Sequence, residues 1–153
     1  MLCRALIQED PFNVQVETQR IRDVSNKMGG IVTFLGVVRD FNEREDVQSL
    51  YLEHYPGMTE SQIENIAYAA GKRWNVLGIT VIHRIGLLSP SDEIVFVGVG
   101  SKHRGDAFLA CEYVIDYLKT EAAFWKKEGT INGGRWLSTR ETDFEAANRW
   151  KQD

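Results

Sequence analysis

The chain is poor in cysteine and proline, and it has no long apolar run. It contains 2 cysteines and 3 prolines in 153 residues. Cys3 and Cys111 form no Cys-x-x-Cys pair and no zinc spacing. We therefore expect no disulfide framework, no metal site and a reducing, cytoplasmic setting. No segment reaches the roughly 18 apolar residues that cross a bilayer, and residues 1–10 turn acidic too early for a signal peptide.

An excess of basic charge is also missing. The formal net charge is −4, which argues against a general nucleic-acid binder, because such proteins usually carry a basic surface. The sequence also lacks a P-loop, a Gly-x-Gly-x-x-Gly turn after a strand, a His-Glu-x-x-His helix and a Gly-x-Ser-x-Gly elbow. We therefore predict no cofactor, no nucleic-acid partner and no membrane partner. Any anion site must come from a local cluster of basic residues.

The pattern along the chain predicts one domain spanning residues 1–153. There is no repeat, low-complexity tract or Pro/Gly/Ser linker, and a chain of this length buries roughly 68–70% of its unfolded surface. We expect a charged loop over residues 40–47. We expect extended segments at 3–8, 13–16, 31–39, 48–55, 76–86, 93–100 and 135–139, and helices at 18–28, 59–74, 103–119 and 141–150. Short runs of strands with intervening helices favour an α+β fold with a largely antiparallel sheet.

Local signals support several of these elements. The spacing of Ile21, Val24 and Met28 predicts an amphipathic helix that Gly29 and Gly30 would end. Thr59 with Gln62 three residues later is typical of a capping box. The nearly continuous apolar run 93–100 predicts a central strand covered on both faces.

Lys119 and Lys126 are the most informative pair. They lie seven residues apart beside Phe124 and Trp125. Seven residues are about two helical turns, so in a continuous helix both ammonium groups would lie on one face, roughly 10.5 Å apart along the axis. A basic face next to aromatic residues suggests a pocket for an anionic, planar ligand. The alternative is that lysines gather at a helix C-terminus because the helix dipole favours cations there.

Two further basic segments are candidates for anion binding. Lys102, His103 and Arg104 lie where the helix at 103–119 begins, and cations are disfavoured at that end unless an anion binds. The alternative is neutralisation by Asp106. Arg39 ends a strand that we expect to be buried, where its guanidinium would suit phosphate or carboxylate. A salt bridge to Asp40 or Glu43 is the alternative.

Other chemically capable residues are expected to be structural. His83 alternates with Val81 and Ile85, which is typical of a half-buried histidine whose polar groups are satisfied. Arg84 next to it is expected to be structural too. Cys111 lies on the apolar face of the helix at 103–119, and we expect an inert thiol.

Several segments together resemble the large, catalytic subunit of molybdopterin synthase. They occur in order over roughly residues 29–140, and each alone is weak whereas seven in sequence are specific. The matching segments are Gly30–Arg39, Leu52–Met58, Val81–Gly86, Asp92–Val99, Ser101–Arg104, Asp116–Lys119 and Phe124–Glu128.

The resemblance implies a fold, partners and a reaction. It implies an α/β-hammerhead-type fold and a homodimer with a small ubiquitin-like subunit at each end, a heterotetramer. The C-terminal Gly-Gly thiocarboxylate of that subunit would enter a pocket and transfer sulfur to cyclic pyranopterin monophosphate, forming the dithiolene of molybdopterin in molybdenum cofactor biosynthesis. Residues 129–153 would contribute to the pocket and to partner contact.

The resemblance also implies roles for individual residues. Lys119 would be the principal catalytic residue and Lys126 its companion. Because like charges lower the pKa of a lysine, we expect Lys119 to act as acid/base or to stabilise developing charge, with Lys126 and Arg39 holding the phosphate. The substrate-binding segments would include Lys119, Lys126, Val37, Val38, Arg39, His103, Arg104, Lys127 and Glu128, with His103 and Arg104 coming from the neighbouring subunit. Family members often have proline at the position of Ala123. Without that proline the helix would extend further.

Two alternatives remain open from the sequence. Cys3 or Cys111 would carry sulfur as a persulfide if this chain itself delivered the sulfur atom. Otherwise the chain would be a non-catalytic scaffold that only binds a ubiquitin-like protein.

Overall fold

The computed structural model describes residues 1–39, 47–130, 133–137 and 140–152, and it contains two four-stranded sheets. Sheet A has the order β1-β4-β6-β2, and sheet B has the order β5-β3-β7-β8. The strands are β1 (Leu2–Gln8), β2 (Gly30–Val37), β3 (Val47–His54), β4 (Val76–Arg84), β5 (Gly86–Leu88), β6 (Glu93–Ser101), β7 (Phe124–Thr130) and β8 (Gly133–Leu137). The helices are α1 (Val14–Arg22), α2 (Met58–Arg73), α3 (Arg104–Leu118) and α4 (Glu141–Asn148), followed by the 3-10 turn η1 (Arg149–Gln152).

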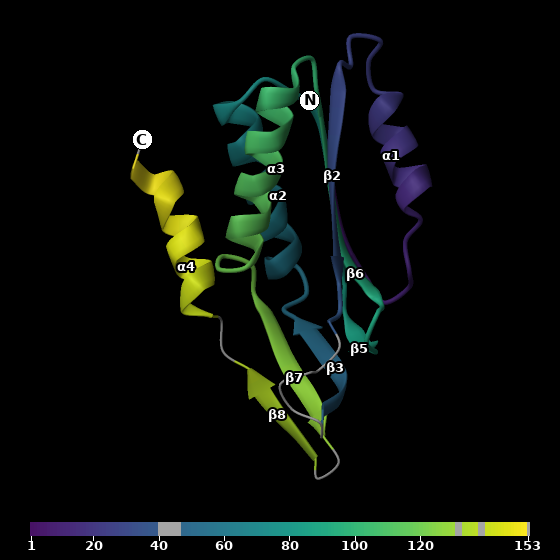
Figure 1. Ribbon diagram of the computed structural model, residues 1–153, viewed down its shortest axis with the longest axis vertical. Coiled ribbons are helices and arrows are strands. Elements are labelled where there is room, and N and C mark those ends of the chain that lie inside the picture. The colour runs from purple at the N-terminus through teal and green to yellow at the C-terminus, as the bar shows by residue number, and fades with distance from the viewer. Residues whose placement is uncertain (40–46, 131–132, 138–139, 153) are drawn as a thin grey trace.

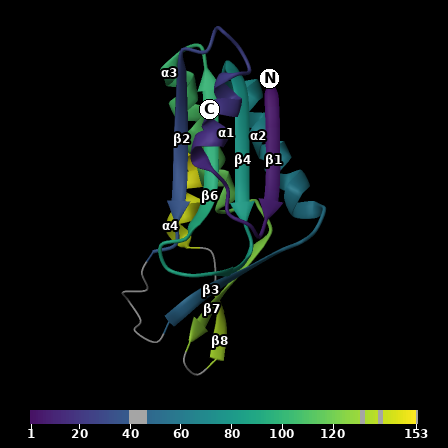
Figure 2. The same ribbon diagram turned by 90° about the vertical axis from the view of Figure 1, so that its right-hand side faces the viewer.

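Helices cover both faces of sheet A. Helices α2 and α3 lie on one face and α1 on the other, with sheet B beyond the end of sheet A (Figure 1). Seen face-on, α1 lies in front of the middle of sheet A, over β4 and β6 (Figure 2). Among the strands of the described residues, only β1 and β4 pair in parallel, and every other ladder is antiparallel. The predicted α+β fold with a largely antiparallel sheet is confirmed.

Strand β6 is the centre of the core, as its apolar run predicted. Residues 95–101 are all buried, because β6 lies between β4 and β2 and both of its faces are covered. On one face Val97 and Val99 join a cluster with α2 and α3 that includes Ile63, Ala107 and Val114. On the other face Phe96 packs with α1 through a second cluster of buried side chains, Ile21 and Ile82.

Helix α1 corrects the prediction for the N-terminal third. The segment 13–16 is not extended, because the Asn13 side chain caps the helix by accepting a hydrogen bond from the Val16 N–H at 3.0 Å. The helix ends at Arg22, well before Gly29. Ile21 is fully buried, whereas Val24 is exposed. The apolar spacing that suggested residues 18–28 therefore belongs only partly to a helix.

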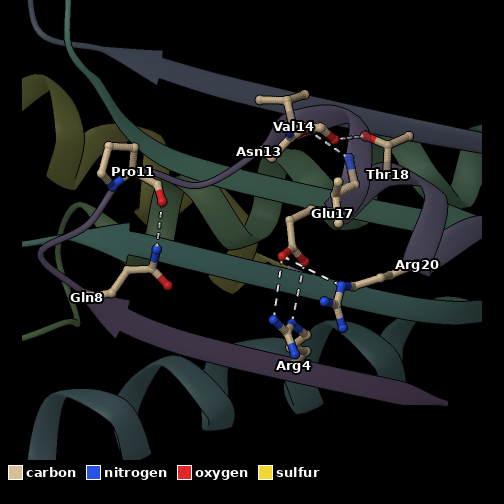
Figure 3. Close-up of polar contacts among 9 residues, drawn as sticks. Arg4, Gln8, Pro11, Asn13, Val14, Glu17, Thr18 and Arg20 are labelled. Carbon is tan, nitrogen blue, oxygen red and sulfur yellow. Dashed lines mark hydrogen bonds and ion pairs between the residues drawn. The ribbon is translucent and has the colours of Figure 1, made fainter.

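A buried carboxylate fixes α1 on sheet A. Glu17 of α1 is buried and forms ion pairs with Arg4 Nε of β1 at 3.4 Å and Arg20 Nε at 3.8 Å (Figure 3). Gln8 Nε2 donates to the Pro11 carbonyl at 3.3 Å, which holds the segment between β1 and α1. These contacts lie on the face of sheet A that is opposite α2 and α3.

The start of α2 differs from the predicted capping box. Gly57 is the N-cap, with φ of 84°, and its N–H donates to Glu60 Oε2. Glycine suits this position because a positive φ strains other residues. Thr59 and Gln62 are therefore not a capping pair, and their side chains bind elsewhere.

Strand β2 is an edge strand, not the buried strand that the sequence suggested. Phe34, Leu35 and Val37 are 38%, 38% and 46% exposed. The register against β6 shifts between Gly36 and Val37. Consequently Val38 turns inward, where it packs with Leu50, Leu52 and Leu88.

Strand β7 was not predicted, whereas the boundaries of the other predicted elements agree to within a few residues. The predicted strand 76–86 is divided into β4 and β5, and the predicted strand at 135–139 begins at Gly133 in β8. Residues 40–46 and 138–139 lie outside the described residues, so the predicted loop and the end of that strand stay predictions.

Candidate functional site

Lys119 and Lys126 lie on different elements, so the continuous helix that would place both ammonium groups on one face does not form. Helix α3 ends at Leu118, and Lys119 is its C-cap, with its N–H directed to the carbonyls of Ile115 and Tyr117. Lys126 lies on β7. Ala123, which stands where the resembling family often has proline, therefore does not lengthen the helix. The alternative of a lysine at a helix C-terminus holds for Lys119 but not for Lys126.

Strand alternation places Lys126 on the inner face of sheet B. Lys126 pairs across the ladder with Leu52, which is 1% exposed. Phe124, two residues earlier on the same face, stacks on His83 of β4 with ring centroids 4.1 Å apart. Trp125 lies on the opposite face, where its ring centroid is 6.1 Å from that of Tyr55. Lys126 therefore lies in a partly apolar environment next to sheet A.

The surroundings of Lys126 favour its neutral form. Burial, the largest cause, and the nearby charges of Lys119, Arg140 and Arg39 together lower the pKa of Lys126 to about 8, whereas Asp143 acts in the opposite direction. Charged residues at the C-cap of α3, after β2 and at the start of α4 therefore all act on the ammonium group of Lys126. Among the described residues, neither Lys119 nor Lys126 has a side-chain hydrogen bond or ion pair.

His83 belongs to the same environment, a position that sequence reasoning missed. Burial lowers the pKa of His83 to about 3, and the charges of Lys126 and Lys119 contribute. Its Nδ1 lies 2.8 Å from the Arg84 carbonyl, so Nδ1 carries the proton and donates it. The predicted half-buried, satisfied histidine is confirmed. Its alternation with Val81 gave no sign of the two lysines nearby.

We expect His83 to make the fold sensitive to acid. The unfolded chain takes up a proton near pH 6.5, whereas folded His83 does so only near pH 3, so its contribution to stability is complete above pH 6.5 and lost as the pH falls toward 3. Between pH 6.5 and 5 the loss is about 2 kcal/mol. Urea unfolding of the parent and of His83→Phe should show a correspondingly smaller loss in the variant. Equal losses in both would contradict this expectation.

The predicted site residues Val37, Val38 and Arg39 differ in their exposure. Arg39 follows β2 and is exposed, and its charge reaches Lys126. Val37 is exposed, whereas the buried Val38 donates its N–H to the Asp92 carbonyl at 2.8 Å. The Val38 carbonyl also accepts from the Ser91 N–H at 2.8 Å, so both backbone polar groups of Val38 are bonded within the chain. The alternative partners of Arg39, Asp40 and Glu43, lie outside the described residues.

His103 and Arg104 lie at the opposite end of α3 from Lys119. Helix α3 has 15 residues, about 22 Å of rise, so one chain does not bring these residues to the lysines. Both are exposed, and His103 is the N-cap of α3 without a side-chain capping bond. Within the described part of the chain, no ion pair joins Asp106 to this basic segment.

Lys127 and Glu128 continue β7 beyond Lys126. Alternation places Glu128 on the face of Lys126 and Lys127 on the opposite face. Both side chains are half-buried. The two residues therefore face different surroundings.

The C-terminal segment adds Arg140 and Asp143, which sequence reasoning missed as site residues. Their charges act on Lys126 from the start of α4. The far end of this segment is fixed on α3, where Trp150 Nε1 donates to Asp116 Oδ2 at 2.6 Å and Arg149 Nη2 does so at 2.8 Å. Arg73 Nη1 of α2 donates to the Trp150 carbonyl at 2.9 Å. No sequence signal linked residues this far apart.

Arg84 is structural, as predicted. Its Nε and Nη2 donate to the Glu9 carbonyl at 3.1 and 3.0 Å, and Nη1 donates to the Glu93 carbonyl at 3.1 Å. The guanidinium therefore joins the ends of three segments of sheet A and is not available to a ligand.

Comparisons with known proteins show the family of this chain. The profile of the MoaE protein family matches residues 7–121. The chain belongs to the MoaE family. A molybdopterin synthase catalytic subunit from Ralstonia nicotianae is 49% identical over 144 residues, 94% of this chain and 82% of the relative. The predicted family, and with it an enzyme of molybdenum cofactor biosynthesis, is confirmed.

Solved structures of the MoaE family agree with the fold. A molybdopterin biosynthesis MoaE protein from Burkholderia ambifaria has a TM-score of 0.86 and 46% identity, covering 99% of this chain and 100% of that chain. A chain in the complex of subunits 1 and 2 of the Helicobacter pylori molybdopterin-converting factor has a TM-score of 0.72. It covers 90% of this chain and 91% of that chain, but at 17% identity it supports the fold alone. In the described part of this MoaE family member, no helix is long and apolar enough to cross a membrane.

Proposed function

We propose that the chain catalyses sulfur transfer to cyclic pyranopterin monophosphate. The sulfur would come from the C-terminal thiocarboxylate of a small ubiquitin-like partner subunit. Each transfer would replace a carbon–oxygen bond of the pterin side chain with a carbon–sulfur bond. Water would then cleave the acyl–sulfur bond and leave the partner with an ordinary carboxylate. Two transfers complete the dithiolene.

The observation that carries this proposal is the environment of Lys126. A half-buried lysine with a pKa near 8 exchanges protons readily near neutral pH, and it lies close to the charges of Lys119 and Arg39. Both reactants are anions, so bringing them together requires fixed cations. The described residues of the site supply these cations from β7, the end of α3 and the segment after β2.

The lowered pKa favours a particular division of roles. The sequence suggested Lys119 as acid/base or charge stabiliser and Lys126 as a phosphate ligand, but the partly apolar surroundings that favour proton exchange are those of Lys126. We therefore assign proton transfer to Lys126 and stabilisation of developing negative charge to Lys119. Arg39 would hold the substrate phosphate, since a guanidinium suits phosphate geometry.

The cysteines do not favour the persulfide alternative. Burial raises the pKa of Cys111 to about 12, so the thiol stays protonated at neutral pH. Burial also raises the pKa of the half-buried Cys3. Because the thiolate is the reactive form, neither position suits a sulfur carrier.

We also propose a homodimer that binds one partner subunit at each end, a heterotetramer. Exposed apolar residues on the adjoining elements β2 and α3 support it, among them Phe34, Leu35, Phe108 and Leu109. In such a dimer His103 and Arg104 would enter the neighbour's site. Light scattering of the purified chain should give the mass of a dimer, and a monomer would contradict the shared site.

The domain boundaries follow the same proposal. Residues 1–153 would form one domain, with residues 129–153 contributing to the pocket and to partner contact. The charges of Arg140 and Asp143 at Lys126 support this contribution. The cytoplasm stays the expected compartment.

Reconstitution tests the proposed reaction directly. The chain is mixed with a thiocarboxylated partner subunit and the pterin monophosphate, and the product is followed by mass spectrometry. We expect a mass gain corresponding to both sulfur atoms and loss of the thiocarboxylate from the partner. The same mixture with an ordinary partner carboxylate is the control. A pterin that stays free of sulfur in the complete mixture would contradict the proposal.

A further inference from the structure

Two side chains of α2 hold the turn that separates Lys119 from Lys126. The N–H of Ala123, the residue before β7, donates to Gln62 Oε1 at 2.7 Å. The carbonyl of the same residue accepts from Thr59 Oγ1 at 2.9 Å. Both backbone polar groups of Ala123 are therefore satisfied by side chains more than 60 residues away in the sequence.

Thr59 joins two strands of sheet B through one hydroxyl. Its Oγ1 also accepts a hydrogen bond from the Tyr55 N–H at 2.9 Å, just after β3. The hydroxyl thus uses its donor on the start of β7 and accepts from the end of β3. Thr59 is 0% exposed, so water cannot replace these bonds.

The position of Ala123 sets which residues of β7 face the site. Lys126 follows three residues later, on the face of Phe124, which stacks on His83 at 4.1 Å. Because side chains alternate along a strand, a slip of one residue would turn Lys126 to the opposite face. A fixed Ala123 also fixes the length of chain between the end of α3 and β7.

We propose that Gln62 and Thr59 are positioning residues that set the placement of Lys126 relative to Lys119. This inference rests on the proposed function for its effect on catalysis, but the geometry concerns the lysines alone. Neither side chain needs to touch substrate. They act by holding the backbone of Ala123.

The lysine environment supplies a readout that does not require turnover. The pKa of Lys126 depends on burial and on the charges around it, so a displaced β7 changes its titration. The charged and titratable groups near Lys126 are Lys119 of α3, His83 of β4, Arg39 after β2, Arg140 and Asp143 at the start of α4, and Glu128 on the same face of β7.

The test replaces the hydrogen-bond acceptor at Gln62. Gln62→Met keeps the length of the side chain and removes Oε1. Asn65→Ala, one turn further along α2 and exposed, is the matched control. In the reconstituted complex we expect Gln62→Met to lower kcat about ten- to hundred-fold with KM nearly unchanged, because small displacements of catalytic groups have effects of this order. Gln62→Glu keeps an oxygen acceptor and should restore most of kcat.

Titration of Lys126 in the isolated chain, by NMR of its side-chain methylene and ammonium groups, gives the independent result. We expect the pKa to rise in Gln62→Met by on the order of 0.5–1 unit, toward that of a solvated lysine. It should stay unchanged in Asn65→Ala. An unchanged titration together with an unchanged kcat in Gln62→Met would overturn the proposal.

A second pair of variants keeps the proposal testable if Gln62→Met does not fold. Thr59→Val removes the hydroxyl, and Thr59→Ser retains it. We expect Thr59→Ser to keep both kcat and the Lys126 titration, and Thr59→Val to change both; equal behaviour of the two folded variants would overturn the proposal. If the parent complex shows no sulfur transfer, the proposed function fails, and the titration alone then decides the role of Gln62 and Thr59.

Discussion

Lys126→Met is expected to inactivate the enzyme while making the folded chain more stable. The variant keeps the length of the side chain but removes the group that exchanges protons, so kcat should fall about 10²–10⁴-fold. Protonated Lys126 is disfavoured by its partly apolar surroundings, and folding pushes its pKa down from 10.5 to about 8. The parent should therefore gain stability as the pH rises from about 8 to 10.5, whereas at pH 7 the variant should be more stable by about 1–3 kcal/mol.

Two measurements check this expectation. Reconstituted turnover gives kcat, and its pH profile in the parent should contain an ionisation near pH 8 that the variant lacks. Urea unfolding at pH 7 gives the free energy of unfolding. Lys72→Met, at an exposed position of α2, is the control and should change stability by less than about 0.5 kcal/mol. A destabilised Lys126→Met that still turns over would contradict both the environment and the role assigned to Lys126.

Lys119→Ala is expected to separate catalysis from partner binding. Lys119 is exposed at the C-cap of α3, so its loss should change stability by only a few tenths of a kcal/mol to about 1 kcal/mol. Removal of a preorganised charge at a reacting centre typically lowers kcat by about 10²–10³-fold. Because the charge of Lys119 helps to lower the pKa of Lys126, that pKa should rise in the variant.

Partner affinity decides how Lys119→Ala is interpreted. Calorimetric titration with the ubiquitin-like subunit should give the same affinity for the variant and the parent, and Lys72→Ala at an exposed position of α2 is the control. A normal turnover rate with intact binding would rule out a catalytic role and favour a scaffold. A loss of binding that accounts for the whole loss of rate would place Lys119 in the docking surface instead.

Much of the fold could be predicted because its signals are local. The continuous apolar run of β6 predicted a strand covered on both faces, and β6 is such a strand. The apolar face of α2, from Ile63 to Ala70, is buried as its spacing indicated. The error at α1 was also local, because Asn13 provides a cap that starts the helix earlier than the apolar spacing suggested.

The site depended on contacts that no local pattern contains. The spacing of Lys119 and Lys126 suggested one site, but it assumed a single helix. The chain turns instead, and Ala123 is bound by Thr59 and Gln62, the residues that the sequence suggested as a helix cap. The side chains of Thr59 and Gln62 thus explain two errors, the predicted capping box and the single helix assumed for Lys119 and Lys126. The charge of Arg140 acts on Lys126 only because the tertiary fold brings the start of α4 near β7, and no sequence spacing indicates this arrangement.

The order of strands in sheet A has a consequence for synthesis of the chain. Of the strands that make up this sheet, only β4 and β6 are both successive in the chain and neighbours, whereas β1 and β2 pair with strands made much later. Strand β1 obtains its partner only after Arg84 has been made, and β2 only after Ser101. Topologies dominated by such distant pairings fold slowly. The apolar β2 therefore leaves the ribosome long before β6 can cover it, and this interval is when the nascent chain is most exposed to aggregation.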